Sequence, residues 1–146
     1  MLYKRGDLLA NVQEGVLVHG CNAQGVMASG IAKQIKAIYP DAYLQYMDDY
    51  LEERLTLGFC SIVKHEIHEE PLYIVSAITQ QFYGRDPNVR YVDYEAIGKV
   101  FLYLKSRFPG MPVNIPKIGA GLGNGNWDQI STIIDAIHPR VICWEL

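Results

Sequence analysis

Two segments of this sequence place closely spaced glycines directly after an apolar run. Val16-Leu17-Val18 leads into His19-Gly20-Cys21-Asn22-Ala23-Gln24-Gly25, and Val113-Asn114-Ile115-Pro116 leads to Gly119-Ala120-Gly121-Leu122-Gly123-Asn124-Gly125. Glycine lets backbone N–H groups approach an anion closely, and the N-terminus of a following helix adds partial positive charge. The two loops therefore predict a cleft that closes on a diphosphate from both sides, and hence a nucleotide-like ligand.

The familiar phosphate-binding motifs do not fit these loops. A P-loop requires Gly-Lys-Ser/Thr after its spacer, but Gly25 is followed by Val26 and Met27. A cysteine phosphatase loop would need arginine six residues after Cys21, where Met27 stands. The glycines of 119–123 resemble a dinucleotide fingerprint, yet too little chain follows them to supply a ribose-binding acid at the next strand. The sequence excludes these three types of site.

The elements that must hold the loops alternate between strand and helix patterns. Buried or half-buried apolar runs predict strands at 2–4, 15–20, 58–65, 72–78, 113–116 and 141–145. Helical spacing and capping residues predict helices at 29–38, from Asp41 to about Leu55, from Asp93 to before Pro109, and at 127–137. The strands at 58–65 and 72–78 are consecutive and predict a hairpin around 65–70. This order predicts an α/β protein, a three-layer α/β/α domain around a central mixed sheet that spans residues 1–146 as one domain.

Composition limits the class of protein. The chain has 146 residues, of which 49% are apolar and 20% are charged, so it can bury a core and is neither disordered nor collagen-like. No apolar run reaches the roughly 20 residues that cross a bilayer, and the N-terminus lacks the pattern of a signal peptide. Three scattered cysteines do not predict a disulfide framework. We therefore expect a cytoplasmic protein without a membrane partner.

The charge balance bears on the choice of ligand. A net charge of −3 and a pI near 5.8, without a basic stripe, do not favour binding of extended nucleic acid. A small anion remains compatible, because backbone amides can hold phosphates without net positive charge.

Three motifs in order resemble those of a macrodomain, the ADP-ribose-binding α/β/α fold. Lys4-Arg5-Gly6-Asp7-Leu8-Leu9 resembles the opening segment of that family, and 19–25 with Gly30-Ile31-Ala32 resembles its first ligand loop. Pro116-Lys117-Ile118-Gly119-Ala120-Gly121-Leu122-Gly123 resembles its second ligand loop. The resemblance runs from Tyr3 to Leu146, and it implies ADP-ribose as the ligand.

The resemblance also favours one branch of the family. The Cys-Asn pair and the Gly-Ile-Ala after it are similar to the branch with ADP-ribose 1″-phosphate phosphatases and a deacylase of ADP-ribosylated carboxylates. Gly123 stands where the deacylases carry aspartate, and 79–83 offers no counterpart of their catalytic lysine. The implied reaction is therefore hydrolysis of ADP-ribose 1″-phosphate to ADP-ribose and phosphate. A noncatalytic ADP-ribose reader and a hydrolase of ADP-ribosyl esters on protein or nucleic acid remain open alternatives.

The resemblance implies roles for individual residues. Asp7, with Leu8 beside it, corresponds to an adenine-contacting acid, although a carboxylate here can also cap a turn. Asn22 is expected to face the distal ribose, with an Asx turn as the alternative. The residues expected to line the two sides of the diphosphate are Gly25, Ser29, Gly30 and Ile31 on one side, and Gly119, Ala120, Gly121, Leu122, Gly123 and Asn124 on the other.

His19 is the candidate catalytic residue. An imidazole near a phosphomonoester can protonate the departing oxygen or activate water, but a strand histidine can also be buried and bonded to a neighbour. Cys21 is expected to be a small buried side chain rather than a nucleophile. Phe82 and Tyr83 can stack on a ligand or pack in the ordinary way. His65 and His68 have a loose metal-like spacing without further ligands nearby, so we expect neither a metal nor a cofactor.

Overall fold

A six-stranded mixed sheet forms the centre of the protein. The computed structural model describes residues 1–66 and 69–146. Its strands are β1 (Leu2–Arg5), β2 (Gly15–Asn22), β3 (Cys60–His65), β4 (Leu72–Gln80), β5 (Val113–Ile115) and β6 (Ile142–Glu145). They lie in the order β1-β6-β5-β2-β4-β3, and each neighbouring pair is parallel except the antiparallel pair β3 and β4. The predicted mixed sheet and hairpin are confirmed; part of the predicted turn, 67–68, lies outside the described residues.

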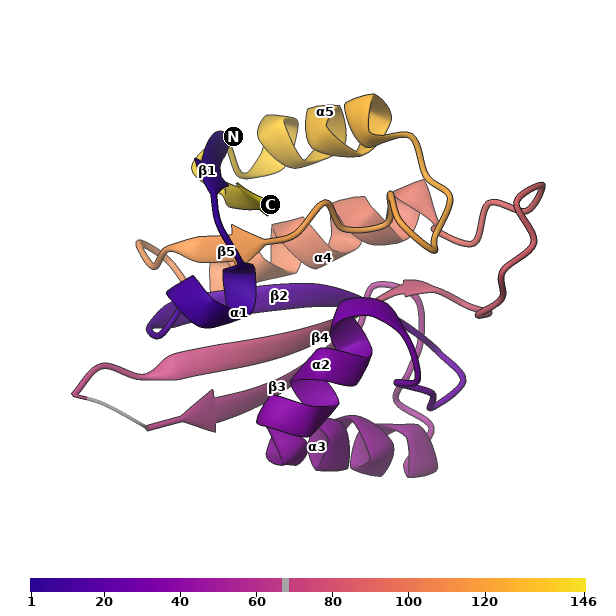
Figure 1. The fold of residues 1–146 in the computed structure, drawn as a ribbon, viewed down its shortest axis with the longest axis horizontal. Helices are drawn as coiled ribbons and strands as arrows, with labels where there is room; N and C mark the ends of the chain where they lie inside the picture. The colour runs from indigo at the N-terminus through magenta and orange to yellow at the C-terminus, as the bar shows by residue number, and fades with distance from the viewer. Residues whose placement is uncertain (67–68) are drawn as a thin grey trace.

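The helices cover both faces of this sheet (Figure 1). They are α1 (Leu8–Asn11), α2 (Gly30–Ile38), α3 (Pro40–Leu51), α4 (Tyr94–Arg107) and α5 (Trp127–Ile137). Side chains of β2 alternate between two layers of core. Val16 and Val18 pack with α4 and α5, whereas Leu17 packs with α1, α2 and α3. The predicted three-layer α/β/α arrangement is confirmed, because successive side chains of one strand face opposite helical layers.

Several element boundaries differ from expectation by one or two residues, as where β2 and β4 each run two residues further, and two differences are larger. Helix α3 ends at Leu51 rather than near Leu55, because Glu53 adopts a left-handed φ of 59° and Arg54 turns back to pair with Asp48 and Asp49. The short helix α1 was not predicted. The Asp7 side chain caps it by accepting a hydrogen bond from the N–H of Leu9 at 3.0 Å.

The two glycine loops follow the carboxyl ends of β2 and β5, which are neighbours in the sheet. Ligands of parallel α/β sheets bind at this edge, beyond the carboxyl ends of the strands. The topology thus brings together two loops that are about a hundred residues apart in the sequence. None of the helices in the described parts of the chain is long and apolar enough to cross a membrane.

Candidate functional site

Three adjoining cavities lie along the carboxyl ends of the parallel strands. A cavity of about 620 Å³ lies beside Asp7, a central one of about 330 Å³ lies between the two glycine loops, and a third of about 320 Å³ lies beyond Asn22. Ile31, Pro116 and Lys117 line both the first and the central cavity. Gly20, Ser29, Ala32, Gln80 and Leu122 line both the central and the third. The shared walls make the three cavities one elongated cleft, whose parts we call the Asp7 end, the centre and the Asn22 end.

The centre of the cleft is lined by both glycine loops. Of the residues predicted to flank a diphosphate, those that line the centre are Ser29, Gly30, Ile31, Gly119, Gly121, Leu122 and Gly123. Ser29 precedes the first turn of α2, and its side chain makes no capping hydrogen bond. The N-terminus of α2 therefore opens toward the centre, where its partial positive charge favours an anion. The ligand role of these residues stays a prediction that this geometry supports.

Three of the residues predicted to line the diphosphate do not line any part of the cleft. Gly25 has a left-handed φ of 78°, and a Cβ there would meet the Tyr50 ring at 2.9 Å, so it serves the turn and the packing of α3. Asn124 donates from its side-chain amide to the backbone carbonyls of Asp86 and Val89, at 3.0 and 2.7 Å. Ala120 packs against the core under α4 and α5. The glycine-rich sequence around these three residues predicts that they line the cleft. In the structure they contact other parts of the protein instead.

Asn22 holds the first loop in shape. Its Nδ2 donates to the Val26 carbonyl at 2.9 Å, and its Oδ1 accepts from the N–H groups of Gln24 and Val26 at 2.9 and 3.4 Å. The Asx-turn alternative therefore describes its side chain, although Asn22 also lines the Asn22 end of the cleft. The Tyr46 hydroxyl is a fourth hydrogen-bond partner of the Asn22 side chain. A contact between Asn22 and a ribose stays a prediction, and the ribose would have to share the amide with these four partners.

The second loop is closed tightly on itself. The Gly123 carbonyl accepts from the N–H groups of Tyr91 and Val92 at 2.9 and 3.0 Å, and a Cβ on Gly123 would lie 2.7 Å from the Gly119 carbonyl oxygen. Gly119 has a left-handed φ of 78°. The loop therefore has no room for a side chain at 123.

His19 lies under the cleft rather than in it. Its ring is fully buried, and its Nε2 is 2.8 Å from the Ser76 hydroxyl on the neighbouring strand β4. Burial lowers the pKa of this imidazole to about 3, so the ring is neutral at physiological pH. It lines none of the three cavities. This position fits the buried-histidine alternative and gives the predicted acid–base role no support.

Cys21 is largely buried beside His19 and lines the Asn22 end of the cleft. Its Sγ is 3.6 Å from the Nδ1 of His19, and burial raises the pKa of the thiol far above its usual range. A protonated thiol is a poor nucleophile. All three cysteines are free and buried, and Cys21 fits the predicted role of a small core side chain.

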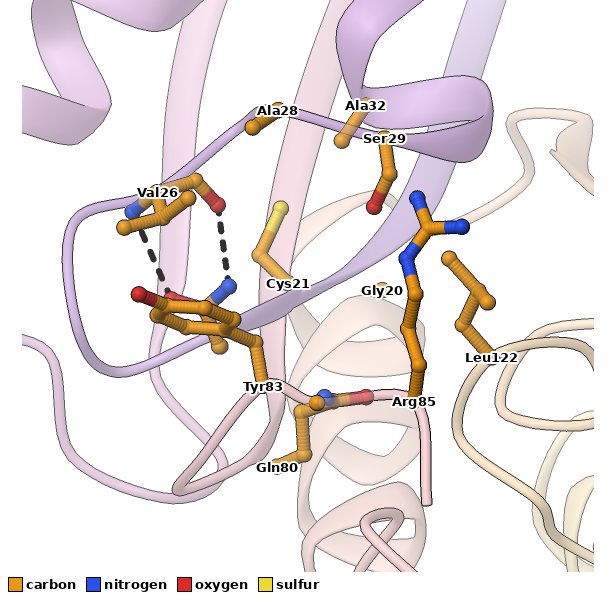
Figure 2. A pocket seen from close by; sticks show the side chains of 12 residues that line it. Gly20, Cys21, Val26, Ala28, Ser29, Ala32, Gln80, Tyr83, Arg85 and Leu122 are labelled. Carbon is orange, nitrogen blue, oxygen red and sulfur yellow. Dashed lines mark hydrogen bonds between the residues drawn. The ribbon is translucent and has the colours of Figure 1, made fainter. Parts of the chain in front are cut away.

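The segment between β4 and α4 forms a third wall of the cleft, in which the sequence offers only Phe82 and Tyr83 as candidate contacts. Tyr83, Gly84 and Arg85 of this segment line the Asn22 end, together with Gln80 at the end of β4 (Figure 2). Phe82, in contrast, is exposed and does not line it. No phosphate motif marks this segment in the sequence. Its residues belong to the site because β4 pairs with β2, which the sequence does not reveal.

This third wall is fastened to both glycine loops. The Tyr83 N–H donates to the side chain of Gln24 in the first loop at 2.9 Å. On the other side, Asn124 of the second loop holds the carbonyls of Asp86 and Val89, as described above. The Asn22 end is therefore bounded by three segments of the chain that hold one another in place.

The Asp7 end combines polar and aromatic groups. Its lining includes Asp7, Leu8, Lys117, Trp144 and Glu145. The Asp7 carboxylate uses Oδ1 to cap α1, so the predicted turn cap is present, while Oδ2 is left available to another donor. Lys117 pairs with Glu145 at 3.0 Å, and this pairing raises the pKa of the lysine. An adenine contact by Asp7 stays a prediction.

Two further features lie away from the cleft. His65 pairs with Asp41 of α3. His68 lies outside the described residues, so the metal-like spacing of His65 and His68 is not tested. Among residues 1–66 and 69–146, no three His, Cys, Asp or Glu side chains gather as a group that could hold a metal ion. A larger cavity of about 890 Å³ lies at the opposite end of the strands, near 108–112 and 138–142, and neither glycine loop lines it.

The two loops and the sheet that holds them match a known family. The family described as Macro domain matches residues 18–134, which include the second part of β2, all of β4 and β5, and both glycine loops. The chain belongs to the macrodomain family. The matched span begins after Asp7 and Leu8, so the assignment rests on the centre and the Asn22 end of the cleft.

Relatives of this macrodomain carry different names. A phage T4 protein, named an uncharacterized 17.5 kDa protein, is 28% identical over 98% of this chain and 96% of its own length. An ADP-ribose 1″-phosphate phosphatase of Meyerozyma guilliermondii is 25% identical over 90% of each chain. A DNA ADP-ribosyl glycohydrolase of Mycobacterium tuberculosis is 27% identical over 88% of this chain, which spans only 36% of that enzyme. The relatives named as enzymes are hydrolases of ADP-ribose derivatives.

Solved structures share the fold. The macrodomain of Mycobacterium tuberculosis DarG has a TM-score of 0.81 at 21% identity, with 99% of this chain and 97% of that chain covered. Thermosipho africanus DarTG, solved in complex with ADP-ribose, has a TM-score of 0.78 at 18% identity. The superposition covers 99% of this chain and 42% of the DarTG chain. At these identities the likeness establishes the α/β/α macrodomain fold.

Proposed function

We propose that this macrodomain binds ADP-ribose along the cleft and hydrolyses ADP-ribose 1″-phosphate to ADP-ribose and phosphate. The observation that carries the proposal is the central cavity between two glycine loops, which is continuous with a cavity at each end. A diphosphate in the centre would place an adenosine and a second ribose in the two ends. The names of the phosphatase relatives support the choice of the terminal phosphate as the group removed.

The chemistry fits the groups that the cleft offers. Phosphoryl transfer depends mainly on positioning and on stabilising charge on the phosphoryl oxygens, and backbone amides with a helix N-terminus supply both. In the hydrolysis, the oxygen of a water molecule forms a bond to phosphorus, and the bond from phosphorus to the 1″ oxygen breaks. The proton lost by water balances the one taken up by the departing oxygen.

Binding is tested by titrating the pure protein with ADP-ribose in a calorimeter, in buffer that contains a chelator. We expect one site, with AMP weaker because it lacks the second phosphate and the distal ribose. Absence of binding at millimolar ADP-ribose would overturn the proposed ligand. Incubation with ADP-ribose 1″-phosphate and an assay of free phosphate then tests the reaction.

A noncatalytic reader is the second candidate, and one observation favours it. The residues that line the Asn22 end include no carboxylate, imidazole or lysine amine within the described parts of the chain. Such a site can recognise a ligand without an acid or base to react with it. A protein that binds ADP-ribose tightly but releases no phosphate would overturn the phosphatase, and it would establish the reader if it also released no ADP-ribose from ADP-ribosylated protein or DNA.

A further inference from the structure

Arg85 differs in kind from every other residue that lines the Asn22 end. It is the one charged side chain in that lining, among uncharged residues such as Gln80, Tyr83 and Leu122. In Figure 2 its side chain extends along the cavity, and the guanidinium group points toward the loop that carries Ser29. Among the residues that the structure describes, no acidic side chain forms an ion pair with it. The wall of the cavity therefore carries a solvent-exposed cation that no acidic side chain among the described residues pairs with.

The backbone on both sides of Arg85 is held in place. Tyr83 is bonded to Gln24, as described above, and the N–H of Asp86 donates to the Tyr91 hydroxyl at 3.1 Å. Between them, a Cβ on Gly84 would lie 2.3 Å from that same hydroxyl, so a side chain there would displace the Tyr91 ring. These contacts fix the Cα of Arg85 at the wall of the cavity, so that the side chain alone has to adjust to a ligand.

The chemistry of the guanidinium group indicates what it would meet. Its planar fork of N–H donors matches phosphate oxygens in pairs, and such charge-assisted hydrogen bonds are stronger than those between neutral groups. The diphosphate of ADP-ribose belongs in the centre of the cleft, where the amides and the N-terminus of α2 lie. With adenosine at the Asp7 end, as the proposed binding mode has it, an anion at the Asn22 end would belong to a substituent on the distal ribose.

We propose that Arg85 recognises a phosphomonoester on the distal ribose, and so makes the cleft selective for ADP-ribose 1″-phosphate over ADP-ribose. The inference rests on the proposed binding of ADP-ribose and adds to it the residue that selects the terminal group. Arg85 acts here as a specificity-determining residue: it binds the phosphate that the unphosphorylated product lacks. The same contact would help to stabilise negative charge on that phosphate during hydrolysis.

The test compares two ligands on three proteins. The ligands are ADP-ribose and an analogue whose 1″-phosphate is replaced by a methylenephosphonate, which resists hydrolysis. Wild-type protein should bind the phosphonate more tightly, and Arg85→Gln should reduce its affinity about tenfold while changing that for ADP-ribose little. Arg90→Gln is the matched control. Arg90 lies in the same segment, stacks on the Tyr94 ring at 4.3 Å and lines no part of the cleft, so both affinities should stay unchanged.

A conservative variant separates recognition from a structural effect. Arg85→Lys keeps the charge but loses the paired donors, so it should recover part of the preference for the phosphonate. The preference of wild-type protein should also shrink as salt is raised from 50 to 300 mM, because Arg85 is exposed to solvent and salt screens exposed charges.

The possible failures are distinguishable. If wild-type protein binds neither ligand, the proposed function itself is wrong. If it binds both equally well, or if Arg85→Gln weakens both equally, the proposed function stands and the role of Arg85 is overturned. An ADP-ribosylated DNA oligonucleotide serves as a third ligand: a loss of affinity confined to it would assign Arg85 to nucleic acid instead.

Discussion

The Tyr46 hydroxyl, on helix α3, lies 2.6 Å from the backbone carbonyl oxygen of Asn22 and 3.0 Å from its side-chain oxygen. Tyr46 is fully buried. The end of strand β2 is thereby attached to a helix that takes no direct part in the cleft. The shape of the first glycine loop consequently depends on how α3 packs, as well as on the loop's own sequence.

Asn22→Ala should destabilise the protein as well as weaken ligand binding. The substitution removes the amide that bonds Gln24 and Val26, and leaves the Tyr46 hydroxyl with one partner fewer. We expect a loss of about 2–3 kcal/mol in the free energy of unfolding, measured in urea. Tyr46→Phe should reproduce part of this loss without touching the cleft. A large loss of ADP-ribose affinity at unchanged stability would show instead that the Asn22 amide serves the ligand directly.

Gly123→Ala should lower both stability and ADP-ribose affinity. The added Cβ would lie 2.7 Å from the Gly119 carbonyl oxygen, which is too close for either to stay in place. Gly121→Ala is the matched control for stability, because a Cβ there meets nothing within 4 Å. The thermal unfolding midpoint should fall for the first variant alone. Equal midpoints for both would contradict the close contact described at Gly123.

His19 should make stability depend on pH in the acid range. Its folded pKa of about 3 lies below the ordinary value of 6.5, so the unfolded chain binds a proton that the folded chain does not. The stability due to neutral His19 is therefore complete above pH 6.5 and is lost as the pH falls toward 3. The loss reaches about 3 kcal/mol at pH 4.

The variant His19→Gln tests this dependence, because glutamine can still reach the Ser76 hydroxyl but does not titrate. The unfolding free energy of the variant should fall less steeply between pH 7 and 4 than that of the wild type. If His19 were instead the acid or base, the variant would lose about 10²–10⁴-fold in phosphate release with stability unaffected.

Asn124→Gly should loosen the third wall while preserving the backbone. Asn124 has a left-handed φ of 57°, which glycine adopts freely, so the substitution removes only the hydrogen bonds to Asp86 and Val89. Amide hydrogen exchange should speed up in 84–90 and stay unchanged in β2. Asn88→Ala, in the same segment, is the control. If exchange in 84–90 does not respond, other contacts hold the wall.

Cleavage of ADP-ribose from a glutamate-modified protein should be slow. Among the described residues that line the Asn22 end, none has a carboxylate or an amine. Residue 80 at the end of β4, in the stretch where the deacylases would have their catalytic lysine, is glutamine. Gel analysis of labelled substrate would measure the release. Brisk release would require a reactive group that the described cleft does not contain.

The regular elements could be predicted from the sequence because their signals are local. The helix at 127–137 was predicted with its observed bounds, and Asp93 caps α4 by accepting from the N–H of Ala96. Apolar runs located every strand. The strand order could not be read in this way, because it depends on which distant segments pair.

The candidate site was predictable where glycines mark it and not elsewhere. The loops around Gly30 and Gly119 line the cleft as expected, but Gly25 and Asn124 carry the same signal for reasons of turn geometry and bonding. Arg85 has no local signal at all. It belongs to the site because β4 lies beside β2, which is a fact of the tertiary structure.

The way in which the third wall is attached has a consequence for substitutions at Arg85. The loops hold it through the side chains of Gln24 and Asn124 and through backbone groups, and none of these bonds involves the side chain of Arg85. A substitution at position 85 is therefore expected to leave the folding of the domain unchanged, whatever its effect on the ligand. The side chain proposed to select the ligand is thus separate from the contacts that hold the wall in place.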